Sequence, residues 1–203
     1  LRHIVALTTP GLIFAAEGRR FGRAIEAVIR ADVEVVTAGE PVPGRRTTPF
    51  ASLLAASASS AAEYAHAEVG PGTVGKILFT SGSTGMPKGV INTQRMLCAN
   101  MEQVSTHFAY FRDVPPVVLD WSPWHHTAGG NHNFNLVLYN GGTFYIDDGK
   151  PTPDAIAKTV RNLREVSPTW YFNLPRGYDA LIPYLRKDRR LRDSFFRNVQ
   201  VLY

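Results

Sequence analysis

The chain has 203 residues, of which 44% are hydrophobic and 19% charged, an ordinary composition for one soluble globular domain or part of a larger one. The formal net charge is +5, but the basic residues form no long tract, so we expect no nucleic-acid partner. The single cysteine, Cys98, excludes an intramolecular disulfide framework, and no apolar run is long enough to span a membrane. We therefore expect a cytoplasmic protein that does not bind membranes, and whether it forms a homo-oligomer stays open.

The first part of the chain alternates strand-like and helix-like patterns. Residues 12–15 predict a buried strand, and residues 19–30 predict a helix with Phe21 and Ile25 on its inner face. Residues 33–37 predict the next strand, which makes a βαβ unit with a parallel sheet. The Ala/Ser-rich residues 51–67 fit either a small helix or a connector.

The second part continues the alternation. Thr93 is expected to cap a long helix that carries an apolar stripe, in which Cys98 is expected to be buried. The stripe consists of Leu97, Met101, Val104, Phe108 and Phe111. Strands are predicted at 117–120, 143–146 and 169–173, and helices at 134–139, from Thr152 onward, and at 178–185 with an interruption at Pro183.

A donor-rich loop lies between two strand-like runs, 76–80 and 89–92. Glycines let backbone N–H groups crowd around an anion, hydroxyls donate further hydrogen bonds, and a lysine adds positive charge. This composition predicts a polyphosphate site rather than a surface turn, and its order differs from a Walker A loop. The expected phosphate-binding residues are Thr80, Ser81, Gly82, Ser83, Thr84, Gly85 and Lys88.

A second informative stretch, 120–135, follows a predicted strand end, where open α/β sheets bind ligands. Trp121 and Trp124 offer flat apolar walls, the pair at 129–130 permits close approach, and Asn131 and His126 can bind oxygen atoms. Histidines 125, 126 and 132 do not match zinc-ligand spacing, so no metal site is expected. The alternative is that these histidines are satisfied in a core or a loop.

The order Thr-Ser-Gly-Ser-Thr-Gly-Met-Pro-Lys-Gly-Val from Thr80 to Val90 resembles the phosphate-binding signature of the adenylate-forming enzymes. That superfamily includes acyl-CoA synthetases, luciferases and peptide-synthetase adenylation domains. Pro123-Trp124-His125-His126 is similar to the family's Pro-x-x-His motif. The resemblance implies that His126 lies between the acyl carboxylate and the pantetheine tunnel. Peptide synthetases have an Asp there, so an amino-acid substrate is disfavoured.

The longer runs 120–135 and 140–151 are similar to bacterial feruloyl-CoA synthases, although His125 and Ala128 depart from that pattern. The resemblance implies an ATP-dependent acid–CoA ligase acting on a hydroxycinnamate such as ferulate, with ATP, Mg²⁺ and CoA. Lys88 and His126 are the implied catalytic residues, and the implied substrate-binding residues are Trp124, His126, Gly130 and Asn131. Alternatives are a fatty-acyl or other aryl-CoA ligase, and a non-catalytic nucleotide- or pyrophosphate-binding module.

The resemblance also implies a fold and an extent. We expect an α/β fold of layered βαβ subdomains with mainly parallel sheets, forming part of the large N-terminal domain of such an enzyme. Residues 1–203 contain neither the family's Tyr-Gly-x-Thr-Glu segment, nor its ribose-binding aspartate, nor its C-terminal domain. The Mg²⁺, adenine and ribose ligands are therefore expected elsewhere, and residues 1–203 alone are expected to be inactive.

Overall fold

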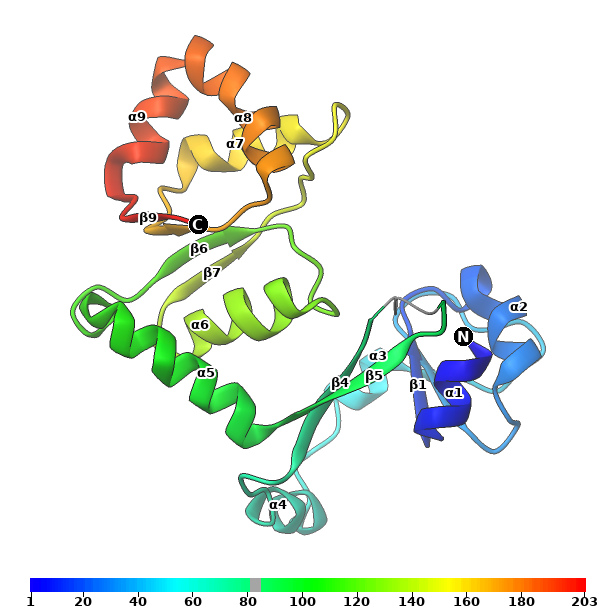
Figure 1. Ribbon diagram of the computed structural model, residues 1–203. Coiled ribbons are helices and arrows are strands. Elements are labelled where there is room, and N and C mark those ends of the chain that lie inside the picture. Colours follow the sequence, from blue (N-terminus) through cyan, green and yellow to red (C-terminus); the bar gives the residue numbers. More distant parts are fainter. Residues whose placement is uncertain (81–84) are drawn as a thin grey trace. The chain divides into compact units, whose positions relative to one another are not determined.

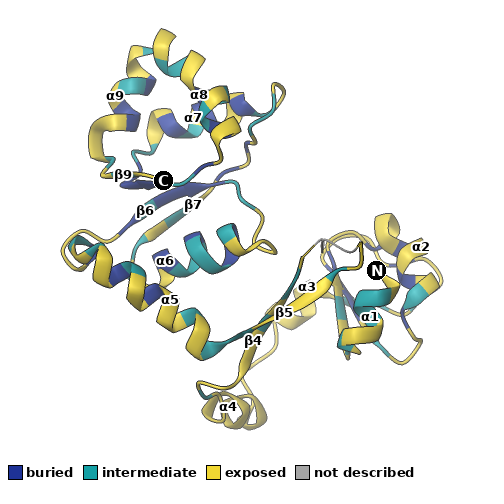
Figure 2. Ribbon diagram, in the orientation of Figure 1, coloured by how far each residue is buried: buried dark blue, intermediate teal, exposed yellow. Residues whose placement is uncertain are grey.

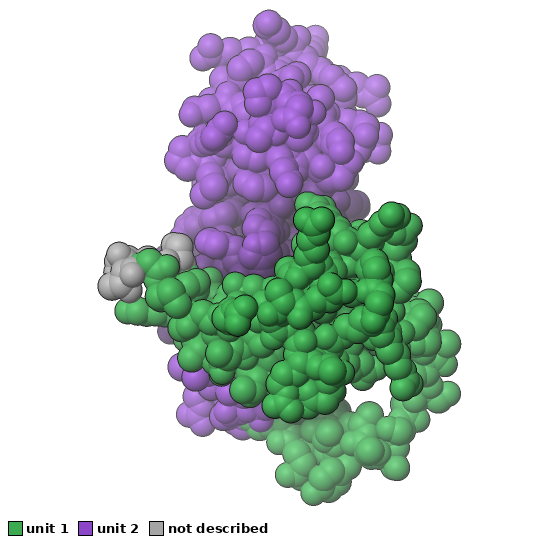
Figure 3. Space-filling view, turned by 90° about the vertical axis from the view of Figure 1, so that its right-hand side faces the viewer, with its two compact units in different colours: residues 1–70, 79–90 green, residues 71–78, 91–203 purple. Residues whose placement is uncertain are grey.

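A computed structural model describes residues 1–80 and 85–203. The chain forms two compact units, one of residues 1–70 and 79–90 and one of residues 71–78 and 91–203 (Figure 3). The predictions made for Ser81, Gly82, Ser83 and Thr84 lie outside the described residues. Each unit is described separately below.

The first unit contains a three-stranded parallel sheet in the order β1-β2-β3. Its elements are α1 (Arg2–Thr8), β1 (Leu12–Ala15), α2 (Gly18–Val28), β2 (Glu34–Thr37), β3 (Thr48–Pro49), α3 (Phe50–Leu54) and α4 (Ser60–Ala67). Ile25 of α2 packs on Ala15 and Val35 of the sheet, which confirms the predicted βαβ unit. Phe21 was expected on the same face but is 42% exposed, with the Arg20 guanidinium over its ring.

Two short helices lie in the Ala/Ser-rich residues 51–67: α3 ends at Leu54, and α4 runs from Ser60 to Ala67. Ser59 begins α4, because its hydroxyl accepts a hydrogen bond from the backbone N–H of Ala62 at 3.2 Å. Every residue of α4 is exposed (Figure 2). The helical alternative was therefore right, although these helices bury no side chain.

Strands β4 (Val74–Thr80) and β5 (Lys88–Thr93) pair as a two-stranded sheet on either side of the donor-rich loop. Both agree with the strand-like runs in the sequence. Thr93 ends β5 and caps the long helix α5 (Gln94–His107), accepting a hydrogen bond from the N–H of Met96 at 3.3 Å.

The second unit is built on a four-stranded parallel sheet with helices on both faces (Figure 1). The strand order is β7 (Thr143–Ile146), β6 (Val117–Asp120), β8 (Trp170–Tyr171), β9 (Val201–Leu202). Helices α7 (Ile156–Glu165), α8 (Pro175–Lys187) and α9 (Arg189–Asn198) cover one face, and α5 and α6 (Phe134–Tyr139) cover the other. The 3₁₀ helix η1 (Ala109–Arg112) follows α5, and the π-helix η2 (Thr127–Asn133) leads into α6.

Two apolar cores lie on the two faces of this sheet. Neighbouring strand residues point in opposite directions, so Val118 packs with Met101 and Leu136 while Leu119 packs with Leu163 of the other core. Strands β6 and β8 are largely buried between the cores, whereas the edge strand β7 is mostly exposed (Figure 2). The α/β fold with parallel sheets agrees with the prediction from the sequence.

Three local expectations for this unit were wrong. The helix expected from Thr152 begins at Ile156, because the Thr152 carbonyl accepts the N–H groups of Ala155 and Ile156 in a preceding turn. Helix α8 runs through Pro183, whose ring faces solvent. Cys98 is exposed, because it lines an open groove between α5 and α6 rather than the core. Within the described part of the chain, no helix is both long and apolar enough to cross a membrane.

Candidate active site

The ends of the donor-rich loop are placed by the two strands. Thr80 is the last residue of β4, Lys88 is the first residue of β5, and both are exposed. Gly85 has φ +86°, a left-handed conformation that favours glycine. His3 Nε2 lies 3.0 Å from the Pro87 carbonyl oxygen and donates to it, since a carbonyl oxygen only accepts. This tie to α1 fixes the peptide before Lys88, and the sequence offered no sign of it.

His126 follows β6 and precedes η2. Its backbone N–H donates to the Pro123 carbonyl at 3.0 Å, and its ring Nδ1 accepts the N–H of Ala128 at 3.2 Å. Because Nδ1 acts as an acceptor, the neutral ring carries its proton on Nε2. The side chain is exposed, so Nε2–H remains available as a donor.

The glycine pair in η2 permits close backbone packing. A Cβ added at Gly130 would lie 2.1 Å from the Trp124 carbonyl oxygen, and one at Gly129 would lie 2.7 Å from that of Pro123. Both glycines are buried. The π-helix can therefore lie directly on the turn that precedes it, which is a structural use of the pair beside the ligand contact expected from sequence.

Two polar links join η2 to the strands β4 and β5. The Asn131 amide donates to Asn92 Oδ1 at 2.9 Å and to Thr127 Oγ1 at 3.3 Å. The Lys76 ammonium donates to the Gly130 carbonyl oxygen at 3.2 Å. Asn131 Oδ1 is buried without a hydrogen-bond partner among the described residues. The contacts of Lys76 and Asn92 with η2 could not be predicted from the sequence, because neither residue belongs to a motif.

An aromatic group lies beside η2. The ring of Trp124 is 4.9 Å from that of Phe134 and 6.1 Å from that of Phe144, measured between centroids. Trp124 is 47% exposed, so one part of its ring is free to meet a ligand. In the described residues, neither Trp121 nor His126 makes a ring contact with this group, so of the two expected apolar walls only Trp124 belongs to it.

The three histidines of this stretch point to different surroundings. His125 and His126 are exposed, whereas His132 packs near Trp170 and Tyr203 and shares a hydrogen bond with Asn133 Oδ1 at 2.9 Å. Across residues 1–80 and 85–203, no group of three or more His, Cys, Asp or Glu side chains could hold a metal ion.

A buried pair fixes the start of the stretch to its end. Asn133 is fully buried, and its amide donates to Asp120 Oδ2 at 2.9 Å. Asp120 Oδ1 accepts the backbone N–H of Ser122 at 2.9 Å. The last residue of β6 is thereby joined to the last residue of η2, which closes the segment carrying His126 into a loop. The sequence shows both residues but not their contact.

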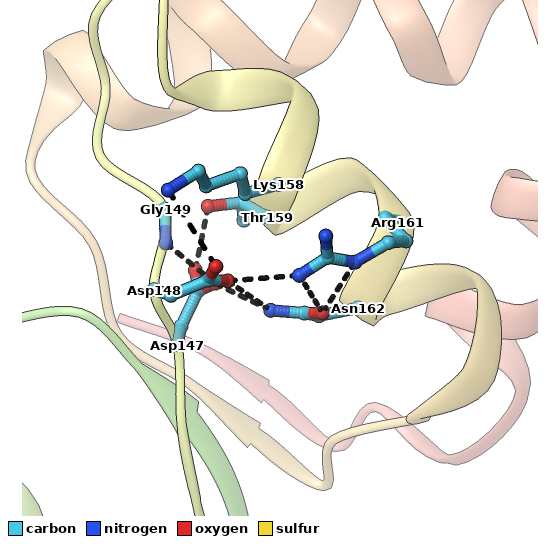
Figure 4. Close-up of polar contacts among 7 residues, drawn as sticks. All are labelled: Asp147, Asp148, Gly149, Lys158, Thr159, Arg161 and Asn162. Atoms are coloured by element: carbon cyan, nitrogen blue, oxygen red, sulfur yellow. Dashed lines mark hydrogen bonds and ion pairs between the residues drawn. The ribbon is translucent and has the colours of Figure 1, made fainter.

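Two neighbouring aspartates, Asp147 and Asp148, follow β7 and contact α7 (Figure 4). The buried Asp147 accepts hydrogen bonds from Gly149 N at 3.0 Å, Asn162 Nδ2 at 2.7 Å and Thr159 Oγ1 at 2.5 Å. The neighbouring Asp148 pairs with cations of α7, and its pKa is lowered by the hydrogen bond from Asn162 and by these charges. These contacts bind the loop to α7.

Cavities among the described residues lie away from His126. In the first unit, a cavity of about 450 Å³ is lined by α1, by Gly11 before β1 and by Val33 before β2. In the second unit, a groove of about 160 Å³ lies between α5 and α6 and includes Cys98 and Tyr139. The first is at the amino ends of parallel strands, whereas ligands in such sheets bind at the carboxyl ends.

Comparison with known proteins gives a family match over nearly the whole chain. The family model for AMP-binding enzymes matches residues 1–201. A hybrid PKS-NRPS synthetase of Fusarium sp. (strain FN080326) is 35% identical over 140 residues, which are 66% of this chain and 3% of that protein. A medium-chain-fatty-acid–[acyl-carrier-protein] ligase of Teredinibacter turnerae is 32% identical over 107 residues, 51% of this chain and 16% of that protein.

A solved structure supports the fold. The ternary product complex of a malonyl-CoA ligase, with methylmalonyl-CoA and AMP bound, superimposes with a TM-score of 0.67 at 19% identity. The match covers 99% of this chain and 37% of that one. This chain therefore spans only a minor part of each of these three proteins.

Proposed function

Because the chain belongs to the AMP-binding enzyme family, we propose that its protein activates a carboxylic acid with ATP and transfers the acyl group to CoA. A carboxylate is a poor acyl donor, since its leaving group would be oxide. In the first step a carboxylate oxygen attacks the α-phosphorus of ATP, and pyrophosphate leaves. In the second step the thiol sulfur of CoA attacks the acyl carbon, AMP leaves, and the thiol proton is lost to solvent.

The observation that carries this proposal is the eleven-residue signature from Thr80 to Val90, set between β4 and β5 of a chain that matches the family model. We assign its hydroxyls, its glycines and Lys88 to the phosphates of ATP. Their contribution is electrostatic, because preorganised donors offset the charge that develops on the departing pyrophosphate. The exposed ammonium of Lys88 suits this role.

Mg²⁺ normally accompanies the phosphates of ATP and is held by one or two carboxylates together with phosphate oxygens. The described residues contain no group of three or more His, Cys, Asp or Glu side chains that could hold a metal ion. We assign no metal ligand among the side chains of this chain.

We assign His126 to the acid. With Nδ1 engaged by Ala128, the exposed Nε2–H can donate to a carboxylate oxygen and hold it for attack. Gly130 and Asn131 complete the proposed acid-binding segment. An amino acid would bring an ammonium group, and the position of His126 carries no acidic side chain to pair with it.

For the class of acid, we propose an aromatic acid, specifically a hydroxycinnamate such as ferulate. The half-exposed ring of Trp124 beside Phe134 offers a flat wall to a planar substrate. A fatty acid is the second candidate, and the similarity to a medium-chain-fatty-acid–[acyl-carrier-protein] ligase favours it. That relative also makes a carrier protein the alternative acceptor to CoA. We propose that residues 1–203 form part of the N-terminal adenylation domain.

The test is the substrate preference of the full-length protein, measured as kcat/KM for thioester formation with ferulate, coumarate, hexanoate and phenylalanine. We expect ferulate or coumarate to be preferred, and phenylalanine to be rejected. Preference for hexanoate would replace the aromatic acid with a fatty acid, and preference for phenylalanine would overturn the role given to His126.

A further inference from the structure

The π-helix η2 is held from outside by one side chain from each strand of the β4–β5 pair. Lys76 of β4 donates to the Gly130 carbonyl at 3.2 Å, and Asn92 of β5 accepts from the Asn131 amide at 2.9 Å. These contacts fall on consecutive residues of η2 and lie within the second unit. Both contacts join residues that are far apart in sequence: the separation is 54 residues for Lys76 and Gly130, and 39 residues for Asn92 and Asn131.

The type of helix makes these contacts of interest. π-Helices are rare, appear mostly as single-turn bulges inside α-helices, and are frequently found at functional sites. Gly130 has no side chain that a neighbouring residue could bind, so Lys76 binds its backbone carbonyl oxygen instead. The Lys76 ammonium is partly buried, and a hydrogen bond from a charged donor is about twice as strong as a neutral one.

The two links differ in how readily they can be replaced. Asn131 also bonds Thr127 inside η2, while its Oδ1 stays buried without a partner among the described residues. Its orientation is therefore a compromise between several groups. Lys76 makes one directed contact to η2, and among the described residues no other side chain donates to the Gly130 carbonyl oxygen.

We propose that Lys76 is a positioning residue for acid binding: by holding the Gly130 carbonyl, it fixes η2 and with it the segment from His126 to Asn131. This inference rests on the proposed function, because that segment is the one we assign to the acid. Lys76 itself touches neither acid nor ATP in this scheme. Its loss should therefore weaken use of the acid while leaving use of ATP unchanged.

The test uses Lys76→Met in the full-length protein. We expect kcat/KM for the preferred acid to fall about tenfold, mainly through its KM, as for loss of one charge-assisted hydrogen bond. The KM for ATP should not change, and Lys76→Arg should recover most of the loss, because its guanidinium can also donate to the carbonyl. Lys187→Met is the matched control, since Lys187 is the exposed last residue of α8 and has no hydrogen-bond or ion-pair partner within residues 1–80 and 85–203.

Amide hydrogen exchange supplies a readout that does not depend on activity. Residues 127–133 should exchange faster in Lys76→Met than in the wild type, while α7 should be unaffected. Unchanged exchange in residues 127–133, or equal acceleration in α7, would overturn the inference. If Lys76→Met does not fold, Lys76→Gln is judged by the same comparison. A wild type that activates no acid would contradict the proposed function, and the exchange rates would still decide whether Lys76 fixes η2.

Discussion

The Asp120–Asn133 pair makes a quantitative prediction about the segment that carries His126. Asn133 is 0% exposed and Asp120 is 3% exposed, and the 2.9 Å bond between them joins the end of β6 to the end of η2. Asn133→Ala removes the donor and leaves Asp120 Oδ2 buried without it. The hydrogen bond shared with His132 is lost as well.

The loss of stability in Asn133→Ala can be estimated from these two hydrogen bonds. A hydrogen bond to a charged group contributes about 1.5–3 kcal/mol, and one between neutral groups contributes about 1 kcal/mol. We therefore expect the free energy of unfolding of the second unit to fall by roughly 2.5–4 kcal/mol. The loss should appear as a lower midpoint in urea with an unchanged slope, because the surface exposed on unfolding stays nearly the same.

The natural tryptophans make this measurement specific. The chain has three, Trp121, Trp124 and Trp170, and all lie in the second unit, so their fluorescence follows the unfolding of that unit. Asn135→Ala is the matched control, because the half-buried Asn135 of α6 makes no side-chain hydrogen bond in the part of the chain that the structure describes. This substitution should cost less than about 0.5 kcal/mol. Equal stability of the two variants would refute the importance given to the buried pair.

The remaining predictions concern the phosphate site, the glycine pair and pH. Lys88→Ala in the full-length protein should slow acid-dependent ATP–pyrophosphate exchange by roughly 10²–10³, as for loss of one preorganised charged donor; an unchanged rate would remove Lys88 from the phosphate set. In thermal unfolding, Gly130→Ala should destabilise the second unit more than Gly141→Ser. A Cβ at Gly130 would collide with the Trp124 carbonyl oxygen, whereas a Cβ at Gly141 would meet open space and only the strain of a φ of +64° would remain. The reverse order would contradict the packing argument. Hydrogen bonds from the Leu191 backbone and Arg164 lower the pKa of Asp188 below its usual 3.8, so its stabilising effect is present above that pH and is lost as pH falls through the lowered value. Asp188→Asn should therefore lower the Tm at pH 7 and lower it progressively less as the pH falls below 3.8, and a difference that is independent of pH would argue against the ion pair.

Local signals in the sequence predicted most of the fold. Strands β1, β2, β6 and β7 were predicted from short apolar runs, and the start of α5 was predicted from the cap residue Thr93. These signals depend only on residues close in sequence, and each element lies at the expected place. The run Asn140-Gly141-Gly142 after α6 is a left-handed cap signal that can be read from the sequence, and Gly141 adopts that conformation with φ +64°. Parallel pairing followed from the alternation of strands and helices.

Contacts between distant residues could not be predicted in the same way. The start of α7 is an example: the Thr152-Pro153-Asp154 signal forms a turn, while Asp147 binds Thr159 and Asn162 further along. In the candidate site, Trp124 and His126 were recognised from a motif, but their surroundings were not. The anchors Lys76 and Asn133 act through partners that a single sequence does not reveal.

The central claim, adenylation of a carboxylic acid, is tested most directly without CoA. Full-length protein is incubated with ATP, Mg²⁺, labelled pyrophosphate and one acid at a time, and incorporation of label into ATP is measured. We predict exchange that depends on the added acid, is strongest with ferulate or coumarate, and is greatly reduced in His126→Ala. Absence of acid-dependent exchange across aromatic, fatty and amino acids would contradict the account.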